Sequence, residues 1–414
     1  MRPRYHVTGE RGWINDPNGP IHHRGTYHVF FQADPPYPPE GPRGWGHATS
    51  SDLVAWERRP PALTPEPSGP DAGGCWSGCT RLIGGRPAIY YTGIPGESVC
   101  RAWGSDDLLA WERDPANPLL AGPGGHHRDP FLWEDGDGWH MLLGSGDTHG
   151  RVLRYDSPDA TAWSPGGVFF EAPRAAGGLD LGEVWECPQL VASGDAAALV
   201  VSCQLPGAAW PLMHAVAFVG RVAGGRFEGR LNGRLDHGDV FYAPAVCRDE
   251  RGRDLLWGWA QERLDPPDHA GALTLPREVA IDKGRLVTRP VPELEALRAE
   301  PLTPGAATPQ MELTGDAGWL LTDGDRRLRI AVERDRLTVA VDDGAVEPRT
   351  FTAPLASRAR HTLRVFVDGS LVEVFADDGD ATITTRAHAS WSRVEPAVGG
   401  AWRLRDDAVG AGRA

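Results

Sequence analysis

The apolar positions of this chain fall into short runs separated by turn residues, and one order of polar and apolar segments recurs five times. Each unit opens with a polar residue, continues as a short extended stretch, breaks at a glycine-containing turn and ends in an apolar strand. The five units read DPNGPIHHRGTYHVFFQ, SGCTRLIGGRPAIYYTG, DPFLWEDGDGWHMLLGSG, ECPQLVASGDAAALVVSCQ and YAPAVCRDERGRDLLWGWA. The sequence therefore predicts five successive β-hairpins built on one plan.

The spacing of these units predicts their architecture. Their turn glycines lie 60, 51, 58 and 58 residues apart by subtraction, at Gly25, Gly85, Gly136, Gly194 and Gly252. The first three units also share an Asp four residues before a Trp, in Asp52–Trp56, Asp107–Trp111 and Asp159–Trp163. Such a period is typical of a β-propeller, because a four-stranded blade buries both faces only between neighbours. We predict a five-bladed propeller over residues 1–290; a β-sandwich or meander with similar hairpins is the alternative.

The first strand of each propeller blade lines the central channel, so the residues that open the five units should converge on one funnel. Three of these openings carry a carboxylate, and the set is Asp16, Ser77, Asp129, Glu186 and the stretch Asp239–Tyr242. The sequence therefore predicts an acidic pocket at the centre of the propeller.

The pattern changes after about residue 290. Residues 291–309 contain a short helical window, Val291–Ala299, and a linker rich in Pro and Gly. Beyond it, RLRIAVERDRLTVAVDDG and LRVFVDGSLVEVFADDG alternate apolar and polar residues, with Asp343-Gly344 and Asp368-Gly369 as hairpin turns. We predict a second all-β domain over residues 310–414, a β-sandwich that covers part of the propeller; glycan binding by this domain is the alternative.

Composition agrees with an all-β fold and narrows the class of partner. The 414 residues include 52 Gly, 37 Pro and 16 Trp, a turn-rich and aromatic mixture that suits many short strands. The formal net charge of −14 argues against nucleic acid and anionic membrane surfaces as partners. Composition leaves the oligomeric state open.

Cysteine usage and the amino terminus predict the compartment. Six cysteines over this length do not form a dense disulfide framework. The chain begins MRPRYH and continues into polar residues, without the apolar segment of a secretory signal. Its apolar runs are also shorter than a bilayer requires. We therefore expect a cytoplasmic protein with reduced thiols.

Three acidic residues that face one pocket favour glycoside hydrolysis. In that reaction one carboxylate attacks or activates water, and a second, protonated one delivers a proton to the leaving oxygen. Burial and like charges give the two groups different pKa values and hence different roles. Sugars also stack on indole rings, and tryptophans stand near the unit openings or inner strands: Trp13, Trp45, Trp76, Trp185 and Trp259. The alternative role for each of these rings is packing between blades.

Each candidate also has a structural interpretation. NDPNG around Asp16 is by itself a turn sequence, and the acids at Asp129 and Glu186 are what favour catalysis. Arg128 either holds Asp129 in its ionised form or is a structural partner. Cys187 follows Glu186 along an expected strand, so we predict that its side chain points to the opposite face and packs.

The sequence implies no metal and no cofactor. The adjacent pairs His22-His23 and His126-His127 would diverge on a strand, and Cys75 and Cys79 have no matching second pair. The glycine-rich segments lack the strand, loop and helix order of a nucleotide-binding loop.

Several motifs together resemble glycoside hydrolase family 32, the group of invertases, levanases and inulinases. The motifs are WINDPNGP, FFQADP, GWGHATSSDLVAW, WSG, RDPF, WECP, DVFYA, LLWGWA and LPREV, and the resemblance continues into LRVFVDGSLVEVFADDG. It implies a five-bladed propeller followed by a β-sandwich, and the release of terminal β-D-fructofuranosyl units from sucrose or short fructo-oligosaccharides.

The resemblance also implies a role for individual residues. Asp16 looks like the nucleophile that forms a covalent fructosyl-enzyme intermediate with retention of configuration, Glu186 like the general acid/base and Asp129 like the transition-state stabiliser. Further residues fall on motif positions that shape the fructose pocket: Asn15, Gln32, Trp45, Trp76, Ser77, Arg128, Tyr242 and Trp259. The implied partner is a small carbohydrate, with no metal or cofactor.

Two alternatives keep the fold but change the function. One is a fructosyltransferase, although Trp13 before the INDPNG run looks more like the hydrolases. The other is a non-catalytic fructan-binding protein, which the intact set of three acids disfavours. Asp34 stands where the family usually has Asn, and we expect it to add a negative charge near the pocket rim.

Overall fold

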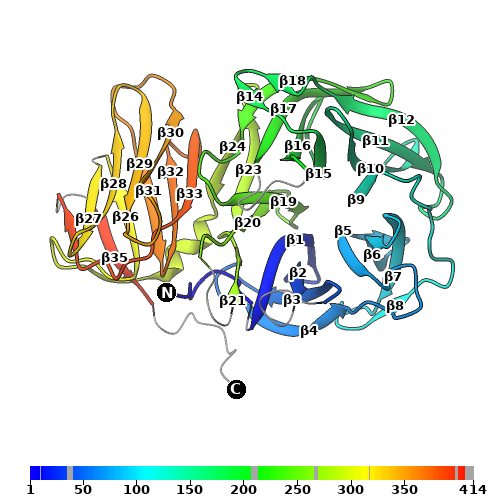
Figure 1. Ribbon diagram of the computed structural model, residues 1–414, viewed down its shortest axis with the longest axis horizontal. Coiled ribbons are helices and arrows are strands. Elements are labelled where there is room, and N and C mark those ends of the chain that lie inside the picture. Colours follow the sequence, from blue (N-terminus) through cyan, green and yellow to red (C-terminus); the bar gives the residue numbers. More distant parts are fainter. Residues whose placement is uncertain are drawn as a thin grey trace.

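The protein consists of two β units that lie side by side, and we describe them from a computed structural model (Figure 1). The structure describes residues 1–9, 11–34, 41–206, 213–264, 269–316, 318–396 and 400–405. The amino-terminal unit is a ring of sheets around a centre, and the carboxy-terminal unit is a pair of packed sheets (Figure 1). The predicted fold class, a five-bladed propeller with a β-sandwich, is confirmed.

The ring has five four-stranded antiparallel blades, and each uses one of the predicted hairpins as its two inner strands. Blade 1 is β1 (Gly12–His23), β2 (Thr26–Asp34), β3 (Gly44–Ser50) and β4 (Glu57–Leu63). Blade 2 is β5 (Gly74–Ile83), β6 (Arg86–Ile94), β7 (Ser98–Gly104) and β8 (Trp111–Arg113). Blade 3 is β9 (His126–Asp135), β10 (Gly138–Gly146), β11 (Gly150–Ser157) and β12 (Ser164–Glu171). Blade 4 is β15 (Val184–Ser193), β16 (Ala196–Gln204), β17 (His214–Ala223) and β18 (Arg226–Arg234). Blade 5 is β19 (Phe241–Arg248), β20 (Asp254–Ala260), β23 (Arg277–Asp282) and β24 (Arg285–Pro290).

Short strands connect the blades and close the ring. Blade 3 leads into blade 4 through β13 (Ala175–Ala176) and β14 (Leu179–Asp180). Within blade 5, β22 (Ala272–Leu273) pairs with β20, while β21 (His269–Ala270) runs parallel to the start of β1. Because β21 belongs to the last blade and β1 to the first, this pairing joins the two ends of the ring.

The repeated Asp and Trp pattern marks a turn that packs one blade on the next. Asp52 accepts hydrogen bonds from the backbone N–H groups of Val54 and Ala55, both at 2.9 Å, and Asp107 and Asp159 bind the equivalent backbone. The tryptophan four residues later packs on an aromatic ring of the neighbouring blade: Trp111 on Phe30, Trp163 on Tyr90 and Trp56 on Trp257, at 5.7, 6.3 and 6.0 Å between ring centroids. The repeat therefore encodes contacts between blades.

The sandwich packs a six-stranded sheet on a five-stranded sheet. The first sheet is β25 (Arg298–Pro301), β35 (Gly400–Leu404), β26 (Gln310–Gly315), β31 (Leu363–Asp368), β32 (Leu371–Ala376) and β33 (Ala381–Arg386). The second is β30 (Arg349–Pro354), β29 (Arg336–Asp342), β28 (Arg326–Val332), β27 (Trp319–Asp323) and β34 (Arg393–Glu395). Both predicted hairpin turns, at Asp343-Gly344 and Asp368-Gly369, connect strands of these sheets.

The segment between the two units is more ordered than the predicted linker. The helical window is a 3-10 helix, η1 (Pro292–Leu297), whose Leu294 and Leu297 are buried. The residues after it form β25 rather than a free connection, since the Arg298 guanidinium binds the buried Glu312 carboxylate with two hydrogen bonds of 2.8 Å. That pairing holds the start of the expected linker against the sandwich.

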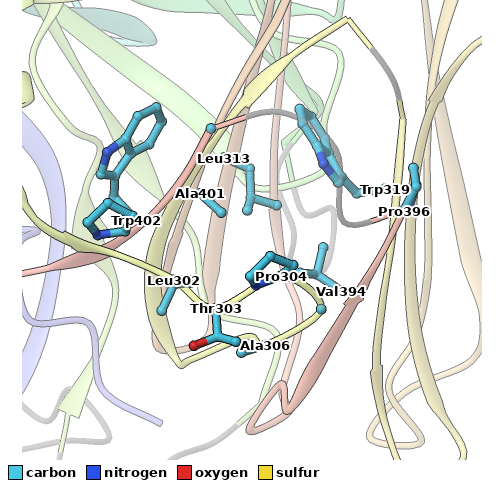
Figure 2. A pocket seen from close by; sticks show the side chains of 13 residues that line it. Leu302, Thr303, Pro304, Ala306, Leu313, Trp319, Val394, Pro396, Ala401 and Trp402 are labelled. Atoms are coloured by element: carbon cyan, nitrogen blue, oxygen red, sulfur yellow. The ribbon is translucent and has the colours of Figure 1, made fainter.

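A small cavity of about 180 Å³ lies at one end of the sandwich (Figure 2). Trp319 and Trp402 stand on opposite sides of it, and the Leu302–Ala306 segment passes below them (Figure 2). Trp319 is 3% exposed, so this ring belongs mainly to the sandwich core.

Blade 5 binds the sandwich through a buried network of charged groups. Arg277 donates to Asp236 at 3.0 Å and to Glu373 at 2.7 Å, and it is fully buried. His6 contacts Asp368 and Glu373 through its two ring nitrogens, at 2.7 and 2.9 Å. The amino-terminal segment also contacts the propeller, since the Leu273 N–H donates to the Val7 carbonyl oxygen at 2.8 Å. It therefore lies between the two units (Figure 1).

Candidate active site

The inner strand of every blade carries a β-bulge, and bulge residues of different blades meet at the centre of the ring, a place that we call the funnel. The pairing between inner and second strands shifts register at each bulge. The residues at the bulges are Asp16, Ser77, Asp129, Cys187 and Ala243, each followed by Pro except Ser77, which Gly78 follows. A bulge turns the local backbone, so consecutive side chains no longer alternate strictly between the two faces of the sheet.

This geometry corrects two predictions. The residue of blade 4 that corresponds to Asp16 and Asp129 is Cys187, and Glu186 comes one position earlier. Cys187 also does not point away from the pocket: its Sγ lies 3.6 Å from Asp16 Oδ2 and 3.7 Å from Asp129 Oδ2. Its left-handed φ of 48° accounts for this, because alternation holds only for an extended strand. Glu186 and Cys187 therefore both face the carboxylates.

Asp16 lies at the centre of the funnel. Ser77 Oγ donates a hydrogen bond of 2.6 Å to Asp16 Oδ2, as expected for two residues from neighbouring blades that open on one pocket. Burial raises the pKa of Asp16 to about 6, although the Ser77 hydrogen bond opposes this and the nearby Glu186 charge adds to it. At neutral pH the group is therefore mostly ionised, with a carboxylate more basic than an exposed one.

Asp129 is held by a side chain of blade 2 and by the backbone of blade 4. Its own N–H donates to Thr92 Oγ1 at 2.8 Å, and its Oδ2 accepts from the Cys187 N–H at 2.9 Å. Burial and the charge of Glu186 raise the pKa of Asp129, and Arg128 opposes them. The charge on Asp129 thus depends on the neighbouring acids and on Arg128.

Glu186 is held from two sides. The Tyr242 hydroxyl donates to Glu186 Oε2 at 2.9 Å and also lies 3.1 Å from the Cys203 carbonyl oxygen. On the other side, Arg128 Nη1 lies 3.7 Å from Glu186 Oε1. Burial raises the pKa of Tyr242 well above its ordinary value, so this hydroxyl is a neutral hydrogen-bond donor.

Aromatic rings lie beside the carboxylates of the funnel. Trp13 and Trp259 lie 5.8 Å apart between centroids and cluster with Cys187 and Tyr242. Trp76 is partly exposed and packs beneath Arg128, with the guanidinium 5.5 Å from the ring centroid. These surfaces suit the apolar C–H faces of a sugar ring.

Other predicted residues support these rings from behind. Trp45 is completely buried, and its indole N–H donates to the Trp76 carbonyl oxygen at 3.0 Å. Gln32 donates to the Cys75 carbonyl oxygen at 3.1 Å. Trp185 lies in the core of blades 3 and 4, so packing between strands is its role.

Two polar atoms at the site are buried without a hydrogen-bond partner in the protein: Asn15 Oδ1 and Arg128 Nε. A buried polar group without a partner costs free energy, which a ligand that supplies the missing hydrogen bond recovers. A polyhydroxylated ligand is suited to this task. The side chain of Asp34 lies outside the described part of the chain.

Among the residues described, no group of three or more His, Cys, Asp or Glu side chains could hold a metal ion. Nor does any helix in that part of the chain have the length and apolar character to cross a membrane.

The structure brings most of the predicted site residues together, and three further residues contact them. Thr92 and Glu97, on and beside the second strand of blade 2, contact the Asp129 backbone and the Arg128 side chain. Cys187 was placed on the wrong face. The recurring residue before Pro in Asp16-Pro17, Asp129-Pro130 and Cys187-Pro188 is the sequence pattern that aligns Cys187 with the two acids.

Comparison with known families assigns both units. The family model "Glycosyl hydrolases family 32 N-terminal domain" matches residues 6–290, and "Glycosyl hydrolases family 32 C terminal" matches residues 319–399.

Individual relatives agree with this assignment. The chain is 31% identical to "Sucrose-6-phosphate hydrolase" of Escherichia coli, over 93% of this chain and 89% of that protein. It is 33% identical to "Raffinose invertase" of Escherichia coli, with the same two coverages. Among solved structures, the Bombyx mori GH32 beta-fructofuranosidase superposes with a TM-score of 0.81 at 27% identity, covering 98% of this chain and 94% of that one. The chain belongs to glycoside hydrolase family 32.

Proposed function

We propose that this protein is a retaining β-fructofuranosidase that releases terminal fructosyl units from sucrose or short fructo-oligosaccharides. The observation that carries the proposal is the convergence of Asp16, Asp129 and Glu186 on one funnel beside aromatic rings, with Arg128 and Tyr242. Two differently held carboxylates are what a retaining glycosidase requires.

In the first step, a carboxylate oxygen of Asp16 attacks the anomeric carbon of the fructosyl unit. The glycosidic C–O bond breaks, and Glu186 gives its proton to the leaving oxygen, so that a fructosyl ester of Asp16 and a free alcohol result. Ser77 supports this role, because its hydroxyl fixes the orientation of Asp16 at 2.6 Å.

In the second step, Glu186 acts as a base. It takes a proton from water, the water oxygen attacks the anomeric carbon, and the ester bond to Asp16 breaks. Glu186 regains its proton and Asp16 its charge, so the enzyme returns to its starting state. Tyr242 and Arg128 support this role by holding Glu186 from two sides.

Asp129 serves as the transition-state stabiliser in this proposal. It binds fructose hydroxyls while positive charge develops at the anomeric carbon. The hydrogen bond from the Cys187 N–H holds the Asp129 carboxylate in position for this role. The remaining predicted residues bind substrate or support those that do: Asn15, Gln32, Trp45, Trp76, Ser77, Arg128, Tyr242 and Trp259. Their burial around the funnel supports this assignment.

The relatives indicate the substrate class. Those named above carry the names sucrose-6-phosphate hydrolase and raffinose invertase, and a variant of the Bombyx mori enzyme forms a complex with sucrose. We propose sucrose or a short fructo-oligosaccharide as substrate, with sucrose 6-phosphate as the alternative that the net charge of −14 makes less favourable.

We also propose the division of the chain and its compartment. The propeller of residues 1–290 carries catalysis, residues 291–309 connect it, and residues 310–414 form the sandwich. All six cysteines are free and buried, which supports a reducing compartment such as the cytoplasm.

A substrate panel tests the proposal. Purified protein is incubated with sucrose, sucrose 6-phosphate, kestose, inulin or levan, and released fructose is measured. We expect sucrose or kestose to be hydrolysed, and Asp16→Asn and Glu186→Gln to be slower by about three to five orders of magnitude with unchanged thermal unfolding. Absence of fructose release from every member would refute the proposal, and trisaccharides accumulating at high sucrose would favour a transferase.

A further inference from the structure

Glu97 lies in the turn between β6 and β7 and reaches across to the inner strand of blade 3. Its Oε2 accepts a hydrogen bond of 2.5 Å from the His127 N–H, and its Oε1 lies 3.4 Å from Arg128 Nη1. One carboxylate thus contacts two consecutive residues directly before Asp129. The side chain is 17% exposed, so water screens these contacts only in part.

Arg128 is shared between two carboxylates. Its Nη1 lies 3.4 Å from Glu97 Oε1 and 3.7 Å from Glu186 Oε1, and the guanidinium stacks over Trp76. The arginine side chain is 6% exposed. Its position, and therefore how strongly it attracts Glu186, depends on the balance between the two acids.

The turn that holds Glu97 is tightly packed. Glu97 has a left-handed φ of 49°, and a Cβ at Gly122 would lie 2.7 Å from the Glu97 carbonyl oxygen. Only a glycine fits at that neighbouring position. Burial lowers the pKa of His127, so the charged partner of Glu97 is the guanidinium of Arg128.

We propose that Glu97 is a positioning residue that acts through Arg128: it holds the guanidinium away from full pairing with Glu186, so that Glu186 keeps the proton it must deliver. This inference rests on the proposed function of Glu186.

Two effects of removing the Glu97 charge act in the same direction. Arg128 would be free to pair more closely with Glu186, which favours the ionised form of Glu186. A negative charge near Glu186 would also be lost, and this too favours ionisation. The other charged or titratable groups facing Glu186 and Arg128 would remain in place: Asp16, Asp129, Cys187, Tyr242 and His126.

The test compares Glu97→Gln and Glu97→Asp with wild type, using the pH dependence of kcat and KM for fructoside hydrolysis. In Glu97→Gln the basic limb of the kcat profile should move to lower pH by about half to one unit, so the rate on that limb falls about three- to tenfold. The KM should change less than kcat. In Glu97→Asp, which keeps the charge, the basic limb should lie at the same pH as in wild type.

A matched control is Glu228→Gln on the outer strand of blade 4. Glu228 also pairs with an arginine, Arg221, at 2.8 Å, but both side chains are exposed. We expect this variant to leave the profile unchanged.

The outcomes separate the two proposals. If wild type releases no fructose, the proposed function fails. If wild type is active and Glu97→Gln lowers kcat equally at every pH, or leaves the profile unchanged, Glu97 is a structural residue and the inference is wrong. If Glu97→Gln unfolds, the pH profiles of Glu97→Asp and Arg128→Lys decide instead. The inference predicts that the basic limb of the kcat profile shifts in Arg128→Lys and stays in place in Glu97→Asp.

Discussion

Two clusters of buried charged residues lie within or beside the propeller. Their carboxylates differ in how many hydrogen bonds they accept from the protein. At the interface with the sandwich, Glu373 accepts hydrogen bonds from the Leu275 N–H at 2.7 Å, the Arg277 guanidinium at 2.7 Å and His6 Nε2 at 2.9 Å. Burial alone would raise its pKa, but Arg277 and His6 outweigh burial and lower it. This carboxylate is ionised and fully engaged by the protein.

The funnel is arranged in the opposite way. Asp129 is also buried, yet it accepts one backbone hydrogen bond, at 2.9 Å from Cys187, and faces other acids. Burial and the Glu186 charge raise its pKa above the ordinary range despite Arg128. Burial alone therefore does not decide whether a carboxyl group is ionised; the hydrogen-bond donors and charges around it do. The interface stabilises the fold, whereas the funnel leaves hydrogen-bonding capacity for a substrate.

The sharpest test of this comparison neutralises one carboxylate in each cluster. Asp129→Asn should reduce kcat/KM by about three to four orders of magnitude. It should also raise the Tm by a few degrees, because it replaces an acid whose raised pKa in the folded protein costs stability at neutral pH.

Glu373→Gln should instead lower the Tm, because Arg277 and His6 lose their partner. Calorimetry on both variants provides the measurement. A lower Tm in Asp129→Asn than in wild type would contradict the view that the acids of the funnel reduce the stability of the fold.

The interface should respond strongly to loss of its cation. Arg277→Met leaves the buried Asp236 without its counter-charge and Glu373 with His6 alone, and we expect the free energy of unfolding to fall by about 3–5 kcal/mol. Denaturant unfolding measures this. Arg289→Met is the matched control, since Arg289 also joins propeller to sandwich, at 2.7 Å from the exposed Asp378, and should cost less than about 1 kcal/mol.

His6 should make the interface sensitive to pH. Burial opposes protonation of this ring, but hydrogen bonds to Asp368 and Glu373 outweigh it and raise the pKa of His6 to about 8. A raised pKa means that the stabilisation is complete below the ordinary histidine range and is lost as pH rises through about 8, a change of about 2 kcal/mol.

Urea unfolding of wild type and His6→Gln between about pH 6 and pH 9 measures this loss. The pH-dependent decrease should disappear in the variant. An identical slope in the two proteins would show that other groups cause it.

Asp16 should make the activity of the enzyme fall at acidic pH. Since burial raises the pKa of Asp16 to about 6 and attack requires the ionised form, kcat/KM should fall about tenfold for each pH unit below that value. Initial rates of sucrose hydrolysis between about pH 4 and pH 8 measure the acid limb. A limb near pH 4 would indicate that the funnel solvates Asp16 more fully than this geometry implies.

The blades could be predicted from the sequence because the residues that specify each hairpin are close together in the chain. A polar opening, a turn glycine and an apolar strand lie within 20 residues or so of one another in each unit, and Gly25, Gly85, Gly194 and Gly252 adopt the left-handed φ that such a turn favours. The acids at Asp16 and Asp129 followed from the same repeat.

The orientation of Cys187 could not be predicted, because it depends on a bulge that breaks the two-residue alternation of the strand. The complete burial of Trp45 also depends on packing, since its ring lies against residues of the next blade. Local pattern does not specify either feature.

The number of blades and the positions of Asp16 and Asp129 follow from a short repeated pattern, and the alternation of apolar and polar residues after about residue 290 predicts the second β domain. The position of Glu186 does not follow from the repeat, because Cys187 occupies the equivalent bulge. Only the tertiary structure decided which buried charges are satisfied. His6 lies 367 residues before Glu373, and Arg277 lies 96 residues before it. These three groups meet only when the sandwich docks, as Glu97 meets Arg128 only when two blades pack. Electrostatic energies depend on distance and burial in the folded chain, and these are properties of the assembled whole.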